Sequence, residues 1–205
     1  FGQDQNLKDE VAVKNAVRLA TQWVLDNGFM NVILEINNEC DINTLAENHG
    51  VDPYEHTILD SKRVHELISL AKSIQKNGRS LLTSTSFIGG SLPSDNVLAL
   101  VDFVLLHGNG VQKAEQLADL VKDVRMKPGY RGNPIVINED DHFDFDKDKN
   151  NFIAAVEKFV SWGYFDYRKA GEDFRVGFQT VPVDWGINSD RKKAFFNKVK
   201  EITGF

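Results

Sequence analysis

The chain has little cysteine, no block of positive charge and no long hydrophobic run, and each shortage excludes a class of protein. Its one cysteine, Cys40, allows no internal disulfide and no cysteine-rich zinc site. Its 24 basic residues against 30 acidic ones give a net charge of -6, whereas nucleic-acid binding needs a positive face that releases counterions. The longest apolar runs, 97–101 and 103–106, are too short to cross a bilayer. We therefore expect neither a nucleic acid nor a membrane as partner.

The rest of the composition is that of a folded domain. The 205 residues are 41% hydrophobic and 26% charged, which provides enough apolar material for a core and argues against disorder. The first residues, 1–5, have neither the charged start nor the apolar centre of a signal peptide. Because the chain begins with Phe1 and not with an initiator Met, we expect a mature or truncated product.

Amphipathic stretches alternate with short apolar runs along the whole chain. In the first stretch, Val13, Val17 and Val24 repeat at the spacing of one helix face, and Gly28 follows as a stop. The pattern predicts helices at 8–26, 60–77, 112–126, 151–162 and 189–203, and strands at 31–36, 80–85, 103–106, 135–137 and 175–181. Alternating strands and helices are typical of a parallel sheet covered by helices, so we predict an α/β fold.

Polar residues gather directly after the predicted strands. They are Asn38 and Glu39, Ser84 and Thr85, His107 and Asn109, Asn138 and Glu139, and Asp184 and Trp185. In a barrel of parallel strands these positions form the carboxyl-terminal face, where active sites lie. A doubly wound sheet would show a glycine-rich turn after its first strand, and this chain has none there. The pattern therefore favours a (β/α)8 TIM barrel.

The number of strands is smaller than a complete barrel needs. Five strands are predicted where a barrel has eight, and a helix comes before the first of them. We therefore interpret residues 1–205 as a single partial barrel domain that supplies about strands four to eight with their helices. Five strands alone would leave open sheet edges, so we expect the missing half of the barrel from another chain or from an upstream segment.

Two glutamates follow strands at the expected active-site face. Glu39 ends the segment 32–39, and Glu139 ends the segment 134–139. Cleavage of a glycosidic bond needs two carboxyl groups, one that protonates the leaving oxygen and one that attacks the sugar or activates water. The two glutamates are far apart in the sequence, so only the fold can bring them together.

These motifs resemble clan A glycoside hydrolases, and most closely the family 5 cellulase and mannanase-type enzymes. The resemblance rests on Asn38-Glu39 after one strand, Glu139 after the third strand that follows, and Trp185 after the last strand. It implies that Glu39 is the acid/base, that Glu139 is the nucleophile, and that Trp185 forms the floor of the sugar site. It also implies that the predicted strands are the fourth to the eighth.

The resemblance further implies a retaining hydrolase of β-linked oligo- or polysaccharides that needs no cofactor and acts in the extracellular space or periplasm. Asn38 would bind the sugar 2-hydroxyl, and His107 would bind substrate. The tyrosine often found in the family two residues after this histidine is absent, because Asn109 stands there. Aromatic residues at 143–167 are expected to divide between packing under the last strand and lining a sugar cleft.

Two other functions stay open. A metal-dependent barrel hydrolase would use His107, Asp140, Asp141 or His142 as ligands, whereas a catalytically silent carbohydrate-binding barrel would use Trp185 to bind glycan.

The acidic run that follows the predicted strand at 135–137 is a weak candidate for a calcium loop. Acidic or amide side chains occupy its alternate positions, at Asp144, Asp146, Asp148 and Asn150. Lys149 and Ala155 stand where a calcium loop needs glycine and glutamate, so a solvated loop is the simpler interpretation. The remaining candidate nucleophile, Cys40, matches no catalytic signature and is expected to be buried and structural.

Overall fold

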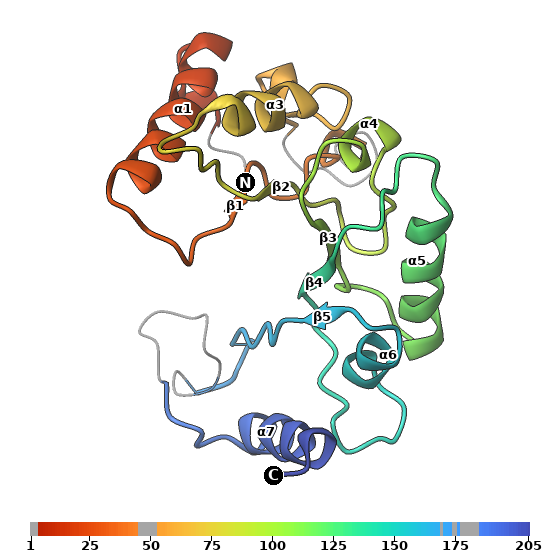
Figure 1. The fold of residues 1–205 in the computed structure, drawn as a ribbon. Helices are drawn as coiled ribbons and strands as arrows, with labels where there is room; N and C mark the ends of the chain where they lie inside the picture. The colour runs from red at the N-terminus through yellow and green to blue at the C-terminus, as the bar shows by residue number, and fades with distance from the viewer. Residues whose placement is uncertain (1–3, 45–52, 169, 174–175, 177–184) are drawn as a thin grey trace.

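The computed structural model describes residues 4–44, 53–168, 170–173, 176 and 185–205. It is a mixed α/β structure in which helices alternate with short parallel strands. Figure 1 shows the helices from α1 to α6 following one another around the outside, with the strands on their inner side. Among the described residues, no helix combines the length and the apolar character needed to cross a membrane.

In the described part of the chain, three helices are longer than nine residues and the strands are short. The helices are α1 (Glu10–Asp26), α3 (His65–Ser73), α4 (Asp95–Leu98), α5 (Ala114–Met126), α6 (Asn151–Glu157) and α7 (Asp190–Thr203), with 3-10 turns at Asp4–Asn6 and Thr57–Leu59. The strands are β1 (Leu34–Glu35), β2 (Thr83–Ser84), β3 (Val104–His107), β4 (Ile135–Glu139) and β5 (Ser161–Trp162).

All paired strands run parallel and follow the order of the chain. β1 pairs with β2 in one sheet, and β3, β4 and β5 lie side by side in a second. Asp102 connects β2 to the start of β3, because its backbone N donates to Thr83 O at 3.0 Å and its Oδ2 accepts from Thr83 N at 2.9 Å. Since the strands of each sheet are parallel, their carboxyl ends lie at one edge, where the predicted polar residues follow them.

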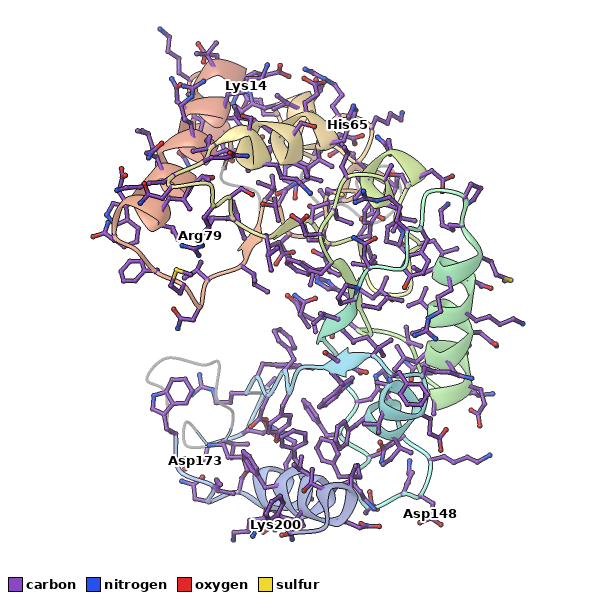
Figure 2. All side chains as sticks on the ribbon, in the orientation of Figure 1. Lys14, His65, Arg79, Asp148, Asp173 and Lys200 are labelled. Atoms are coloured by element: carbon purple, nitrogen blue, oxygen red, sulfur yellow. The ribbon has the colours of Figure 1, made fainter. Side chains whose placement is uncertain are left out.

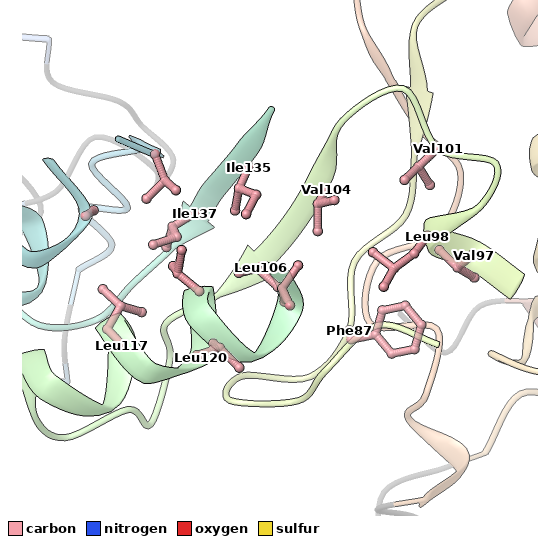
Figure 3. Close-up of a cluster of buried hydrophobic side chains, with 14 of the residues drawn as sticks. Phe87, Val97, Leu98, Val101, Val104, Leu106, Leu117, Leu120, Ile135 and Ile137 are labelled. Atoms are coloured by element: carbon pink, nitrogen blue, oxygen red, sulfur yellow. The ribbon is translucent and has the colours of Figure 1, made fainter. Parts of the chain in front are cut away.

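The main core lies between the strands and the outer helices. Figure 3 shows Leu117 and Leu120 of α5 facing Leu106 of β3 and Ile137 of β4. The buried residues of α5 recur at intervals of three and four, which is the spacing of one helix face; they are Leu117, Leu120, Val121 and Val124. This packing fixes which faces of β3 and β4 are turned away from the helices and are available for a site.

The helices predicted at 8–26, 112–126 and 189–203 are confirmed to within two residues at each end. The predicted helix at 60–77 is shorter, since α3 covers only His65–Ser73, and the strands predicted at 31–36 and 80–85 shrink to two residues each. The short helix α4 was not predicted. In α1 the buried face runs through Val13, Thr21 and Leu25, and Trp23 on another face is 60% exposed.

α6 ends earlier than predicted. The sequence pattern predicted a helix over 151–162, but the helix ends at Glu157, and Phe159 has a left-handed backbone with φ +53° that cannot continue a helix. The chain then becomes extended, and Ser161–Trp162 forms β5 beside β4. The helix prediction is therefore wrong for its last residues. The strand predicted at 175–181 lies outside the described residues except for Val176, which is in no strand.

Candidate active site

Glu39, His107 and Glu139 come together at the carboxyl ends of β1, β3 and β4. His107 Nδ1 lies 2.9 Å from Glu39 Oε1 and 3.8 Å from Glu139 Oε2. One oxygen of each glutamate and one ring nitrogen of His107 all lie within 4.8 Å of one another. The His107 side chain is fully buried, whereas the side chains of Glu39 and Glu139 are 16% and 20% exposed. Three residues predicted from separate segments thus form one cluster that a ligand can reach.

A β-bulge turns Glu139 toward this cluster. Leu106 pairs with Ile137, and both side chains lie in the core beside α5 (Figure 3). The next pair is His107 with Glu139, so Asn138 is an extra residue in β4. In a regular strand, residues two apart share a face, and Glu139 would point with Ile137 toward the helices. The bulge instead sets Glu139 beside His107 on the opposite face.

Glu39 occupies a turn after β1 with a left-handed backbone, φ +51°. This conformation is uncommon for residues other than glycine and asparagine, and strained backbone is concentrated at functional sites. Ser86, buried beyond the end of β2, holds the turn from the neighbouring segment. Glu39 N donates to Ser86 Oγ at 2.9 Å, and Cys40 N donates to Ser86 O at 3.0 Å. The direction of the Glu39 side chain is therefore set by a tertiary contact.

Asn38 lies next to Glu39 and is half-buried. Ser86 Oγ donates to Asn38 Oδ1 at 3.3 Å, and Tyr54 Oη donates to Asn38 O at 2.8 Å. Because Ser86 occupies the side-chain oxygen, the amide nitrogen of Asn38 is the group that can donate to a ligand.

Glu139 is held by the loop that follows β3. Asn109 Nδ2 donates to Glu139 Oε2 at 3.0 Å, and Gly108 N donates to Glu139 O at 2.6 Å. A flipped amide would set Asn109 Oδ1 against a carboxylate oxygen, so the donor orientation is the electrostatically favourable one. The sequence marked Asn109 only as a polar residue after a strand.

The site contains more carboxyl groups than its basic groups can neutralise. Burial raises the pKa of Glu139, the neighbouring Glu39 adds to the rise, and His107 and the Asn109 hydrogen bond oppose it. Burial also raises the pKa of Glu35, whose Oε1 is buried without a hydrogen-bond partner in the described chain. Among the described residues, His107 is the one basic group that pairs with Glu39 or Glu139.

Asp140, directly after Glu139, is a buried structural residue. Its Oδ2 accepts from Trp162 Nε1 at 3.0 Å, and its Oδ1 accepts from Asn151 Nδ2 at 3.1 Å and from His142 N at 3.0 Å. These contacts join the end of β4 to β5 and to the start of α6.

The metal-ligand set predicted from His107, Asp140, Asp141 and His142 divides into two groups. His107 lies with Glu39 and Glu139, whereas Asp140, Asp141 and His142 form a separate group of close ligand atoms. The buried Asp140 oxygens in that second group already accept hydrogen bonds. The alternative ligands of the predicted metal therefore lie in two separate places.

The tryptophan at the end of the last described strand, β5, is Trp162. The tryptophan predicted to bind sugar, Trp185, is not in a described strand. Trp162 pairs with Ile137 and so faces the helices, where the rings of Phe152 and Phe195 lie 5.3 Å and 5.8 Å from it. Trp185 is 77% exposed, and residues 177–184 before it lie outside the described residues. A role of Trp185 over the sugar stays a prediction.

The aromatic residues at 143–167 differ in how deeply they are buried. Phe145 is 4% exposed and packs edge-on against Trp162, whereas Phe143, Tyr164 and Tyr167 are half-buried. The Phe143 ring lies 5.9 Å from Tyr164 and 6.2 Å from Tyr167, so these three rings form one cluster.

The acidic run after β4 is organised by hydrogen bonds of its own. Asn150 Oδ1 caps α6 by accepting from Ile153 N at 2.9 Å, and Asp144 accepts from Lys147 Nζ at 2.9 Å. Asp148 is exposed on the outer side of the loop (Figure 2). This geometry is that of a solvated, helix-capping loop. Cys40 is buried and burial raises the pKa of its thiol, as expected of a structural cysteine.

Three residues of the site were not named from the sequence as functional: Ser86, Asn109 and, on β1, Glu35. The one sequence signal for Ser86 and Asn109 is a polar residue shortly after a strand, which many loop residues share. Comparison of the chain with family models, curated proteins and solved structures gives no significant match, and the chemistry of the site rests on its own geometry.

Proposed function

We propose that this chain is the catalytic part of a retaining glycoside hydrolase that cleaves a β-linked oligo- or polysaccharide. The observation that carries the proposal is the approach of a Glu39 oxygen and a Glu139 oxygen to within 4.8 Å. Retaining enzymes hold their two carboxyl groups about 5–5.5 Å apart, whereas inverting enzymes need about 6.5–9.5 Å to admit a water molecule. The short separation supports retention.

In the first step, Glu139 attacks the anomeric carbon while Glu39 donates a proton to the leaving oxygen. A bond forms between a Glu139 oxygen and the sugar, the glycosidic C–O bond breaks, and the leaving group departs as an alcohol. Because Asn109 donates to Oε2, Oε1 is the oxygen available for the attack.

In the second step, Glu39 is a carboxylate and takes a proton from water. The water oxygen attacks the anomeric carbon, and the bond to Glu139 breaks to return its carboxylate. His107, 2.9 Å from Glu39, stabilises the negative charge that Glu39 carries between the two steps. Asn38 donates from its amide nitrogen to the sugar 2-hydroxyl.

The same proposal includes the (β/α)8 barrel, with β1 to β5 as strands four to eight. Its support is the sequential parallel order of the strands and the position of the site at their carboxyl ends. Three further strands would complete such a barrel, and we assign them to another chain or to an upstream segment. We also propose that the enzyme acts in the extracellular space or periplasm.

The test is turnover of aryl β-glycosides and of β-linked gluco- and manno-oligosaccharides by the purified chain together with the chain or upstream segment that supplies the three further strands. We expect hydrolysis that EDTA does not affect, and the β-anomer as the first product detected by proton NMR. Glu139→Gln should abolish turnover, whereas Glu115→Gln, at an exposed position on α5, should leave it unchanged. An α-anomer as the first product, or no hydrolysis of any substrate, would contradict the proposal.

A divalent metal is the second candidate, because Glu39, His107 and Glu139 each offer a ligand atom within 4.8 Å of the others. A metal-dependent hydrolase would lose its activity in EDTA and regain it with Zn²⁺ or Mn²⁺. A carbohydrate-binding barrel without catalysis would bind oligosaccharide equally well after Glu39→Gln and Glu139→Gln and would show no turnover.

A further inference from the structure

The last residue of β3 and the first two residues of the loop after it all contact Glu139. His107 Nδ1 lies 3.8 Å from Glu139 Oε2, Gly108 N donates to Glu139 O at 2.6 Å, and Asn109 Nδ2 donates to Glu139 Oε2 at 3.0 Å. The backbone and the side chain of Glu139 are therefore both held from one short segment. Asn109 is the residue of this segment that hydrogen-bonds the carboxylate itself.

Two glycines allow this segment to come so close. A Cβ on Gly108 would lie 2.6 Å from Asp140 Oδ2, and a Cβ on Gly89 would overlap the backbone carbonyl of Asn109. Gly90 N also donates to His107 O at 3.1 Å. The loop is thus enclosed between the end of β4 and the segment at 89–90, and the position of the Asn109 amide is set on both sides.

Only one of the two polar atoms of the Asn109 side chain is hydrogen-bonded in the described chain. Its nitrogen donates to Glu139, whereas its Oδ1 is buried with no hydrogen-bond partner in the described chain. A buried acceptor without a partner costs stability. The favourable contact of this side chain is therefore the one with the Glu139 carboxylate.

We infer that Asn109 is the positioning residue of Glu139, a neutral donor that fixes one oxygen of its carboxylate. The amide has no proton to lose in the working pH range, so it donates at every pH at which the protein is folded. A hydrogen bond to the charged form of a carboxyl group makes that form easier to reach. Loss of the donor should therefore move the ionisation of Glu139 to higher pH. The kinetic consequence rests on the proposed function, but the ionisation itself does not.

The experiment is a carbon-13 NMR titration of the Glu side-chain carboxyl groups in the labelled chain. Glu139→Gln identifies the Glu139 resonance by its disappearance. We expect the titration midpoint of Glu139 to rise in Asn109→Ala, which lacks the donor. In Asn109→Asp a second carboxylate faces Glu139, and the midpoint should rise by about one pH unit or more.

The matched control is Asn96→Asp, which makes the same change of charge on α4. It should leave the Glu139 midpoint where it is in the unmodified chain. Circular dichroism checks that each variant is folded. If Asn109→Asp does not fold, the titration of Asn109→Ala alone tests the inference. An unchanged Glu139 midpoint in the folded Asn109 variants would overturn the inference.

Kinetics supply the second readout. The acid limb of kcat/KM for the hydrolysed aryl glycoside should move to higher pH in the order unmodified, Asn109→Ala, Asn109→Asp. A merely structural role would lower activity at every pH without moving the limb, and that result would also overturn the inference. Absence of turnover in the unmodified chain overturns the proposed function instead, and the NMR titration still tests Asn109.

Discussion

Glu139 lies opposite His107 in the ladder between β3 and β4, although regular pairing would put Asn138 there. This one-residue irregularity is the reason that Glu139 shares a face with His107 and not with the buried Ile137. With Glu39 2.9 Å from the same histidine, the two carboxylates meet at a single imidazole. The predictions below follow from that arrangement and from the burial of the groups around it.

Glu39→Ala should separate substrates by the quality of their leaving group. Hydrolysis of unactivated oligosaccharides should fall by about 10²–10⁴-fold, because the leaving oxygen then departs without a proton. With 2,4-dinitrophenyl glycosides, the rate of the first step should fall far less, since this leaving group needs little protonation. Added azide should restore turnover of the dinitrophenyl substrate and yield the β-glycosyl azide. Equal losses on both substrates would contradict the acid/base role of Glu39, and Glu115→Ala is the control.

His107→Ala should lower kcat by up to about a hundredfold, because displacement of a catalytic group by about 1 Å has an effect of that size. The substitution removes the ring that contacts both glutamates. His107→Gln keeps an amide donor near Glu39 and should recover part of the loss. Steady-state kinetics measure kcat for both variants, and circular dichroism checks that each is folded. Full activity in His107→Ala would show that the imidazole does not organise the pair.

Glu35→Gln should stabilise the protein near neutral pH. Burial raises the pKa of Glu35 above its ordinary 4.5, so the folded chain binds the proton more tightly than the unfolded chain does. The stability that comes from this proton is present below the unfolded pKa and is lost as the pH rises through the folded pKa. Glutamine is neutral throughout and avoids that loss.

Thermal melts at pH 4 and pH 7 measure the effect of Glu35→Gln. We expect a rise in Tm at pH 7 of roughly 2–4 °C, which corresponds to about 1 kcal/mol for a chain of this size, and a smaller rise at pH 4. Glu115→Gln, on the exposed face of α5, should change neither value. A lower Tm at pH 7 would mean that the Glu35 carboxylate is stabilised by contacts of its own.

Gly108→Ala should destabilise the protein by about 1–3 kcal/mol, the usual cost of inserting a methyl group into a packed site. The new Cβ would lie 2.6 Å from Asp140 Oδ2, and Asp140 is held in place by Trp162, His142 and Asn151. Urea unfolding measures the loss. Because Trp162 donates to the displaced oxygen, the native tryptophan fluorescence should also change.

The comparison variant for Gly108→Ala is Gly110→Ala in the same loop. A Cβ at Gly110 meets no atom within 4 Å, so this variant adds only the backbone strain of its positive φ, +76°. It should leave the tryptophan fluorescence unchanged. If both variants alter the fluorescence equally, the contact between Gly108 and Asp140 is not what constrains this loop.

Local pattern was sufficient to predict the three longest helices of the described chain and the segments that precede the site. The apolar spacing in 112–126 requires one buried helix face, and the β-branched run before Glu139 forms β4, where Ile135 and Ile137 are buried. Polar residues after such runs must leave the sheet at its carboxyl edge. The positions of Asn38, Glu39, His107 and Glu139 in the fold follow from these local preferences.

Tertiary contacts decided the rest. No local preference indicates that Asn138 is skipped in the pairing with β3, because alternation along β4 alone would turn Glu139 toward α5. The left-handed backbone of Glu39 depends on Ser86, which is distant in sequence, and the end of α6 depends on the chain turning at Phe159 to pair with β4. The sequence by itself determined which residues reach the carboxyl edge of the strands. Pairing between strands decided which of their side chains face one another, because register is a property of two segments and not of one.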